Sequence, residues 1–595
     1  MKTFINVAQM KLATLQAGQF VETGGEVVKG DGGQARYLVT AGVSPDDSVS
    51  PDLANGNHAL YQGVGAVNDL SQAYVFDTFD TMINSTLLLP VGKVVSYKKR
   101  GAFDGGFACV VSGTGSANTR DIIASTSVNR SYSIKTPLVS TPELFGAIGD
   151  NVTNDSKAVA DAVSYGEDFK LPVYITRSHL MNSDKIRLLG NNDISGTGTL
   201  RIVGQDEGLS IRGSNIKWNS VKIIAESTGN TVKGVVNFRE TADLLENVNI
   251  EYIDIDCDAL SGTPITDSPA DILKLRRDIK IISPTLKTVR TDTFHYGIFI
   301  QSSTERLRIV DFDITLPVEA ANPIAIYGNA KEFYVGEGRI HSGGHSGIAA
   351  SISSYGVIAN NIIKGITQNT EAAIEIEYKA NHALDPTVGS SKITVTGNQS
   401  DGCNTGFLVT HRDGVPTTAQ LPSEIVTSGN QYLNCTGRAL NLTYGKNISI
   451  GDDYYHSSGL TEAALIGTIG QQLDNVTIKA KFLAENDDGV LVANGGTDVL
   501  FNAVQVKSLT GRAVTISASS TVGFDMLGGK YDGATRGISD DGGSGVTRLL
   551  NAYVVAGSSF TVSGLATGST VGNLSYSGTA PSTGGGVVTY NNNTV

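Results

Sequence analysis

The sequence predicts an all-β protein built as a right-handed parallel β-helix, because one short pattern recurs at a nearly constant spacing. Each repeat is a small residue (proline once), then an apolar, a variable, a usually apolar and a variable position, as in residues 297–301 and 373–377. Ten such segments follow at intervals of 24 to 33 residues, starting at Gly297, Pro323, Gly347, Ala373, Gly406, Ala439, Ala464, Gly489, Ala513 and Gly537. A second apolar strand keeps the same interval. Repeats of this length, made of short strands, are typical of solenoids whose stacked coils bury one continuous core.

Two earlier members of the series, Gly208 and Gly234, lie 26 residues apart. The longer gap from Gly234 to Gly297 predicts one further coil that carries an insertion. The coils that begin at Ala373 and Gly406 are the longest, and their extra residues, within 380–390 and 412–421, are expected to form walls of a cleft. The β-helix is therefore predicted to occupy residues 139–555.

Residues before and after the repeats define the remaining segments. A β-rich pattern in residues 17–39 recurs 72 to 74 residues later, which predicts two small modules, 1–70 and 71–138. Next, Asp155 or Asn154 is expected to cap a short helix that closes the open end of the solenoid, with the apolar stripe Ala158, Val159, Ala162 and Val163. Residues 556–595, rich in Gly, Ser, Thr and Asn, are expected to form a tail with possible trimer contacts.

Composition excludes several classes of protein. The net charge of −13 argues against a nucleic-acid partner, which would need clustered Lys and Arg. No stretch has the 18 apolar residues of a membrane span, and residues 1–10 lack the apolar core of a signal peptide. The four cysteines have no metal-binding spacing and are expected to be free thiols, and neither a metal nor another cofactor is expected.

Two segments resemble known families. Residues 145–155, Phe-Gly-Ala-Ile-Gly-Asp-Asn-Val-Thr-Asn-Asp, resemble the opening motif of the pectate-lyase-like β-helix superfamily, which is found at the head of bacteriophage tailspike β-helices. Residues 12–37 resemble the N-terminal virion-anchoring modules of tailspikes. The resemblance implies a homotrimer in the phage tail, docked through its N-terminus on the baseplate or other tail proteins. It also implies a β-helix that binds, and usually cleaves, a bacterial surface polysaccharide such as O-antigen or capsule. Polygalacturonases share the superfamily, but their Asp-Asp pair is missing here, so their catalytic residues are not carried over.

The first candidates for catalysis are Glu375 and Glu377. Ile374 and Ile376 occupy the inward positions of this strand, so both glutamates point away from the core. Their backbone positions lie about 6.5–7 Å apart, which suits the carboxyl spacing of an inverting glycosidase. The residues predicted beside them in adjacent coils are Ala349, Leu408, Ser351 and Thr410, none of them acidic, so a retaining pair across coils is not available there. The alternative is a solvated strand face.

Other residues complete the candidate site. His345 lies one coil before the glutamates, and His411 and Arg412 lie one coil after. These three, with the aromatic rings of Tyr327 and Tyr378, are predicted to bind the polysaccharide. Asp311 and Asp313, which alternate outward in the same way, form a second candidate catalytic pair, and a third acidic run is Asp254, Asp256 and Asp258.

The sequence favours a hydrolase but leaves two alternatives. A lyase would need a uronic-acid substrate, a base and a cation, for which His345, Lys379 and Arg412 are candidates, although two glutamates would oppose an acidic sugar. The second alternative is an adhesin that binds polysaccharide without cutting it. In some trimeric tailspikes the catalytic acids come from two subunits, so an active site between chains stays open as well.

Overall fold

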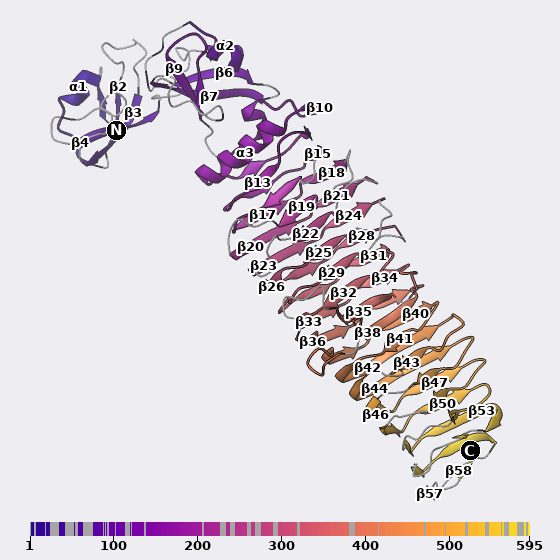
Figure 1. The fold of residues 1–595 in the computed structure, drawn as a ribbon. Coiled ribbons are helices and arrows are strands. Elements are labelled where there is room, and N and C mark those ends of the chain that lie inside the picture. The colour runs from indigo at the N-terminus through magenta and orange to yellow at the C-terminus, as the bar shows by residue number, and fades with distance from the viewer. Residues whose placement is uncertain are drawn as a thin grey trace. The chain divides into compact units, whose positions relative to one another are not determined.

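In the computed structural model the chain divides into two compact units, Met1–Leu180 and Met181–Val595 (Figure 1). Each unit is described by itself below. The structure describes the whole chain except residues 1, 5–6, 18, 24–34, 42–52, 54–56, 64–74, 87–88, 90, 92–93, 101–102, 113–119, 121, 136–138, 205–207, 227–233, 239–243, 259–262, 268–274, 290–295, 318–321, 370, 380–386, 414–415, 469–471, 494–495, 518–521, 542–546, 561, 564–569, 580–587, 591–592 and 595.

Unit 1 contains two small sheets. The first has four strands in the order β1 (Lys2–Phe4), β2 (Phe20–Thr23), β3 (Ala35–Ala41) and β4 (Asn57–Gly63). The second has five, in the order β5 (Val75–Phe76), β6 (Val94–Arg100), β7 (Phe103–Ser112), β9 (Arg130–Lys135) and β8 (Ile122–Ala124). Two short helices accompany them, α1 (Val7–Lys11) and α2 (Phe79–Ile83). In both sheets most neighbouring strands are antiparallel, unlike the strands of unit 2.

The motif at residues 145–155 forms the turn that leads into helix α3 (Ser156–Phe169). Asp155 occupies the N-cap position, but its carboxylate does not cap the helix. It accepts hydrogen bonds from the backbone N–H groups of Ile148 (3.0 Å) and Gly149 (2.9 Å) and lies 2.9 Å from Nδ1 of the buried His179. Gly149 has φ +70°, and an added Cβ would meet a neighbouring side chain, so the close turn requires glycine. The motif therefore serves to fix this turn.

The helix itself agrees with the sequence prediction. Asn154, the other candidate cap, accepts a hydrogen bond from the backbone N–H of Ser156 at 3.1 Å. Helix α3 packs against the 3-10 turn η2 (Pro142–Phe145) within unit 1. The predicted apolar stripe is buried along the helix, as Ala158, Val159, Ala162 and Val163.

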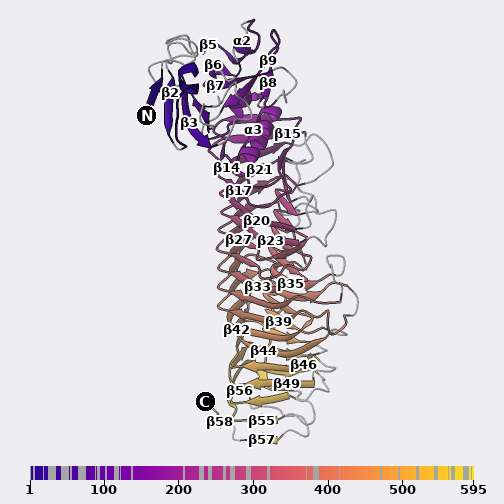
Figure 2. The same ribbon diagram turned by 90° about the vertical axis from the view of Figure 1, so that its left-hand side faces the viewer.

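Unit 2 is a stack of coils joined by parallel strands (Figures 1 and 2). One sheet holds fifteen strands, one from each successive coil, paired in parallel: β13 (Ile186–Leu188), β16 (Leu209–Ile211), β19 (Val236–Phe238), β22 (Ile265–Asp267), β25 (Ile298–Ile300), β29 (Ile324–Ile326), β32 (Ile348–Ser351), β35 (Ala372–Tyr378), β38 (Thr405–His411), β41 (Leu440–Leu442), β43 (Ala464–Ile466), β45 (Val490–Val492), β48 (Val514–Ile516), β51 (Ile538–Asp540) and β54 (Val562–Ser563). The all-β, parallel β-helix architecture predicted from the sequence is confirmed.

The fifteen-stranded sheet follows the sequence repeat. Each of the ten segments identified by its small first residue supplies one strand, from β25 to β51. Gly208 directly precedes β16, and Gly234 lies just before β19. Strand β22 belongs to the further coil that is predicted between Gly234 and Gly297. The remaining strands of unit 2, from β14 (Asp193–Ser195) to β58 (Asn593–Thr594), form two parallel columns of a second sheet. Its last members lie in the segment 556–595, whose described strands thus continue the parallel pairing.

A row of buried amides runs along the second sheet. Asn361 Nδ2 donates to Asn398 Oδ1 at 2.9 Å, and Asn398 Nδ2 donates to Asn430 Oδ1 at 2.9 Å. Asn430 Nδ2 donates to Asp453 Oδ1 at 3.0 Å, so the row ends on a carboxylate. All four side chains are buried in four successive coils. We call this row the asparagine ladder. It satisfies polar groups at the coil turns that would otherwise be buried without partners.

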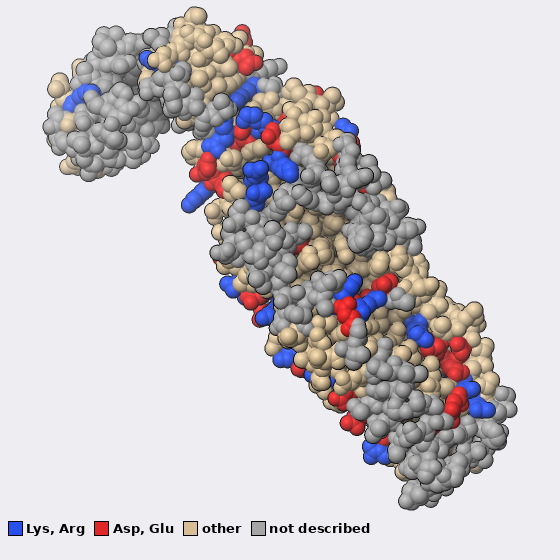
Figure 3. Space-filling view, viewed as in Figure 1, with Lys and Arg blue, Asp and Glu red and all other residues tan. Residues whose placement is uncertain are grey.

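On the visible face of unit 2, the described acidic and basic side chains lie close together in several mixed groups (Figure 3). No helix among the described residues is long and apolar enough to cross a membrane. All four cysteines are free, and three of them, Cys257, Cys403 and Cys435, are buried, as the sequence predicts.

Candidate active site

The backbone of strand β35 places its two glutamates as the repeat predicts. Ile374 and Ile376 are fully buried in the core. Glu375 and Glu377 alternate with them along the strand, so their side chains leave it on the outer side. Glu375 is in register with Ala349 and Leu408, and Glu377 is in register with Ser351 and Thr410. These are the four neighbours that the sequence predicts, and no acid stands beside either glutamate in the adjacent coils.

The side chains, however, do not form a solvated face. Glu375 is 2% exposed and Glu377 is 3% exposed. Arg412, which follows strand β38 in the next coil, folds back over both of them. Its Nη2 lies 2.6 Å from Glu375 Oε1, and its Nε lies 3.0 Å from the same oxygen and 3.2 Å from Glu377 Oε2. The solvated-face interpretation is therefore wrong for these residues, because one guanidinium covers and pairs both carboxylates.

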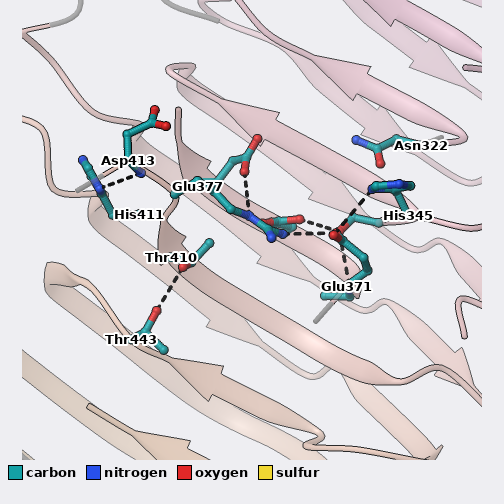
Figure 4. Close-up of polar contacts among 12 residues, drawn as sticks. Asn322, His345, Glu371, Glu377, Thr410, His411, Asp413 and Thr443 are labelled. Atoms are coloured by element: carbon teal, nitrogen blue, oxygen red, sulfur yellow. Dashed lines mark hydrogen bonds and ion pairs between the residues drawn. The ribbon is translucent and has the colours of Figure 1, made fainter. Parts of the chain in front are cut away.

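A third glutamate joins the cluster, and the sequence analysis did not single it out. Glu371 directly precedes β35, and its carboxylate lies 3.1 Å from Arg412 Nη2 and 3.5 Å from His345 Nδ1. Figure 4 shows Glu371 between His345 and the guanidinium, with Glu377 on the other side. The alternation of strand faces could have indicated Glu371, because residues 371, 373, 375 and 377 are all odd-numbered and therefore share one face of an extended chain.

Ser346, next to His345, connects two of the three glutamates. Its hydroxyl lies within hydrogen-bonding reach of Glu375 Oε2 and is 3.1 Å from Glu371 Oε2. The hydroxyl oxygen of Ser346 also accepts a hydrogen bond from the backbone N–H of Ala372 at 3.2 Å. Ser346 is fully buried, so these groups are the environment of its hydroxyl. We call Glu371, Glu375, Glu377, Arg412, His345 and Ser346 the glutamate cluster.

The glutamates of the cluster differ in pKa. Burial, then repulsion from Glu377, raises the pKa of Glu375 to about 8, although Arg412 opposes the shift. Burial also raises the pKa of Glu377, against the attraction of Arg412. Burial would raise the pKa of Glu371 too, but His345 and Arg412 outweigh it and the net shift is downward. These shifts favour the protonated form of Glu375 and the ionised form of Glu371.

The predicted ligand-binding residues are distributed unevenly around the cluster. Arg412 and His345 belong to the cluster, and their side chains are 26% and 35% exposed, respectively. His411, at the end of β38, is buried and its ring stacks on Tyr378 with centroids 4.4 Å apart. Its Nδ1 accepts the N–H of Asp413, and its Nε2 has no hydrogen-bond partner among the described residues. Burial lowers the pKa of His411, which favours the neutral ring.

Neither predicted tyrosine presents an open ring face. Tyr378 is buried between His411 and its own strand, and its hydroxyl accepts a hydrogen bond from Gln420 at 2.8 Å. Tyr327 is 4% exposed, and its hydroxyl accepts a hydrogen bond from Asn322 at 2.7 Å. The partly exposed rings of this region are Tyr296 and Phe299, which stack on each other with centroids 4.4 Å apart and pack against Tyr327.

The second candidate pair lies elsewhere. Asp313 begins β28 (Asp313–Thr315) in the second sheet and pairs with His341 Nε2 at 2.8 Å. Asp311 lies in the preceding turn with φ +54° and accepts a hydrogen bond from Ser283 at 2.7 Å. The two aspartates therefore do not alternate along one strand, because a turn separates them. Of the third acidic run, Asp254 pairs with Lys222 at 2.9 Å, also in the second sheet.

Several parts of the predicted site lie outside the described residues. These are most of the first inserted loop, residues 380–386, together with residues 414–415 of the second and residues 268–274 and 290–295 of the earlier insertion. Among the residues that the structure describes, no three His, Cys, Asp or Glu side chains are arranged to hold a metal ion.

No protein-family model and no curated protein sequence matches this chain. The solved structures similar to it include full-length tailspike protein 2 from Escherichia coli O157:H7 bacteriophage CAB120, with 11% identity, a TM-score of 0.33, and coverage of 88% of this chain and 63% of that one. Another is the mannuronan C-5 epimerase AlgE6 A-module of Azotobacter vinelandii, with 13% identity, a TM-score of 0.33, and coverage of 74% and 100%. A third is the N-terminal fragment of bacteriophage Phi29 gene product 12, with 17% identity, a TM-score of 0.38, and coverage of 73% and 70%.

Proposed function

We propose that this chain is a phage tailspike that binds a bacterial surface polysaccharide and hydrolyses its glycosidic bonds at the glutamate cluster. The observation that carries the proposal is three glutamates gathered around Arg412, of which Glu375 has a raised pKa and Glu371 a lowered one. Glycoside hydrolysis needs one carboxyl group that keeps its proton and one that stays ionised. The tailspike-like motifs at residues 12–37 and 145–155 support the assignment to a phage and a homotrimeric assembly.

In this proposal Glu375 is the proton donor. Its pKa of about 8 keeps it protonated at neutral pH, so it can protonate the oxygen of the leaving sugar. Glu377 is the partner carboxylate that acts at the anomeric carbon, held by Arg412 Nε. Burial raises the pKa of Glu377, and the positive charges of Arg412 and Lys379 oppose this shift, so in this proposal these two cations support the ionised form of Glu377.

The carboxyl spacing supports a retaining rather than an inverting reaction. The backbone separation along the strand suggests the roughly 6.5–9.5 Å of inverting enzymes. In the structure, however, Glu375 Oε1 lies 3.0 Å and Glu377 Oε2 lies 3.2 Å from the same atom, Arg412 Nε, so these two oxygens are less than about 6.5 Å apart. That separation is below the range of inverting pairs and closer to the roughly 5–5.5 Å of retaining pairs. A retaining pair on one strand, rather than across coils, is therefore proposed.

A lyase is less well supported. Its cation has to neutralise a substrate carboxylate, whereas Arg412 already pairs with Glu371, Glu375 and Glu377. A non-cleaving adhesin is the second candidate, and the low exposure of Glu375 and Glu377 favours it, because an ion-pair network can also serve only to hold two coils together. The aromatic pair Tyr296 and Phe299 would suit polysaccharide binding in either case.

The deciding experiment is incubation of the pure protein with a panel of capsular polysaccharides and O-antigens. New reducing ends without ultraviolet absorbance from an unsaturated uronate would support the hydrolase. Absorbance from that product would identify a lyase. Binding to a polysaccharide without either signal would identify an adhesin.

A further inference from the structure

The hydrogen bonds of the Ser346 hydroxyl limit which carboxyl groups of the glutamate cluster can carry a proton. The hydroxyl has one proton to donate and two lone pairs with which to accept. One lone pair takes the N–H of Ala372, and the other contacts of Oγ are a carboxyl oxygen of Glu371 and one of Glu375. The hydroxyl can donate to only one of these carboxyl groups. The other must itself be protonated and donate to Ser346, or a lone pair would face a carboxylate without a proton between them.

The surroundings decide which of the two carries the proton. Arg412 contacts both carboxyl groups, Glu375 at 2.6 Å and Glu371 at 3.1 Å. Glu371 also faces His345, and its side chain is 11% exposed, so its charged form is the better stabilised. Glu375 is nearly inaccessible and stands beside a second glutamate, so its neutral form is favoured. The titratable or charged groups that interact with this pair are Glu377, His345, Arg412 and Tyr327, and Lys379 and Tyr296 interact with Glu377.

We propose that Ser346 is a positioning residue that makes Glu371 and Glu375 share one proton, and that its hydroxyl turns from Glu371 to Glu375 when Glu375 gives that proton away. In the resting protein Glu375 donates to Ser346, and Ser346 donates to ionised Glu371. The second half of the proposal rests on the proposed function. When Glu375 transfers its proton to the leaving sugar oxygen, the O–H of Ser346 rotates and donates to the new Glu375 carboxylate. The attacking water then returns a proton to Glu375 and the hydroxyl turns back, so no proton is gained or lost over the cycle.

The test uses the full-length chain with Ser346→Ala, and with Ser346→Thr to restore a hydroxyl. Ser353→Ala is the matched control, because Ser353 is also a buried serine of this coil but donates only to backbone carbonyls. The first readout is infrared titration of protonated carboxyl groups, which needs no substrate. We expect a carboxylic-acid band at neutral pH that Glu375→Gln removes. We also expect Ser346→Ala, but not Ser353→Ala, to move the titration of Glu371 to higher pH, because ionised Glu371 loses a donor.

The second readout is the pH dependence of cleavage. Loss of a hydrogen bond to a charged group corresponds to about a 10- to 100-fold decrease in kcat for Ser346→Ala. The basic limb of the profile, which reports the proton donor Glu375, should move to higher pH because ionised Glu375 loses the hydroxyl donor. Ser346→Thr should recover most of both effects. If Ser346→Ala leaves the infrared titration and the pH profile as in the natural protein, the proton-sharing proposal is overturned while the hydrolase proposal stands. If the natural protein cleaves no polysaccharide, the hydrolase proposal fails and the infrared titration alone decides whether the proton is shared.

Discussion

Arg412 Nη2 lies 2.6 Å from Glu375 Oε1, although the two residues belong to neighbouring coils. The same guanidinium also reaches Glu371 and Glu377, so one cation balances three carboxyl groups. Burial alone would lower the pKa of Arg412, but the three glutamates raise it. The arrangement joins strands β35 and β38 outside the core, at the place where the candidate chemistry is located.

Removing this cation should destabilise the solenoid. In Arg412→Gln, nearly inaccessible carboxyl groups lose their only guanidinium among the described residues, and breaking a buried ion pair from one side costs about 3–5 kcal/mol. We expect a clear fall in the unfolding temperature, measured by calorimetry. Arg306→Gln is the control, because Arg306 makes an equally close double contact with Asp278 on the surface, and it should have little effect. Equal effects of the two substitutions would contradict the structural importance assigned to Arg412.

Conversion of the catalytic candidates to amides should separate cleavage from binding. Glu375→Gln and Glu377→Gln preserve side-chain size, and each is expected to lower kcat by about 10²–10⁴, the range for general acid–base groups. Polysaccharide affinity, measured by calorimetric titration, should change little. Asp311→Asn and Asp313→Asn serve as the comparison, since Asp313 lies in the other sheet and Asp311 lies in the turn before it. If the substitutions at Asp311 and Asp313 abolish cleavage while those at Glu375 and Glu377 do not, the second pair is the catalytic one.

The stereochemistry of cleavage tests the convergence of the carboxyl groups on Arg412. Because Glu375 and Glu377 both contact Arg412 Nε, a retaining reaction is proposed, and the first product should keep the anomeric configuration of the substrate. Proton magnetic resonance of freshly released oligosaccharide, recorded before mutarotation, measures this directly. Inversion would mean that the groups move apart when the polysaccharide binds, or that another acid contributes.

Stability should fall as pH rises from about 5 to about 8. The folded-state pKa of Glu375, about 8, is above the ordinary value of 4.5, so the folded chain holds a proton that the unfolded chain releases. This contribution is fully present below the unfolded pKa and is lost as pH rises through the folded pKa. Urea unfolding of the natural protein and Glu375→Gln across this window provides the measurement. The advantage of the natural carboxyl group over glutamine should shrink with rising pH, and a constant difference would contradict the shift.

The assembly prediction is independent of the cluster. A homotrimer has about three times the chain mass of 62.3 kDa, which light scattering of the pure protein resolves. If the protein is a monomer at all concentrations measured, the trimer prediction is wrong and the tailspike proposal is weakened. The proposal that Glu375 and Glu377 act as the catalytic groups would be unaffected.

The spacing of the repeat predicts the backbone of the site better than its side chains. The register of Glu375 and Glu377 with their neighbours follows from small residues recurring every coil, because parallel pairing and the alternation of strand faces are fixed by backbone geometry. Burial of the two glutamates could not be predicted in the same way. It depends on Arg412 folding back from the next coil, a choice of side-chain conformation that leaves no periodic pattern.

Two other residues show the same limit. Glu371 has the parity of the outer face, yet it lies outside the five-residue repeat on which the sequence analysis relied. Ser346 looks like part of a Gly- and Ser-rich turn, and only its contacts with two carboxyl groups distinguish it from other serines. Tyr327 and Tyr378 illustrate the reverse case, since nothing in the local sequence indicates that their neighbours cover the rings.

The asparagine ladder passes through the two coils that carry the inserted residues, from Asn361 through Asn398 and Asn430 to Asp453. Its amides fix the coil turns on the second sheet, while the insertions leave the chain elsewhere in those coils. Loop length can therefore change over generations without altering how the coils stack. New loops could then be tried on a scaffold that still folds.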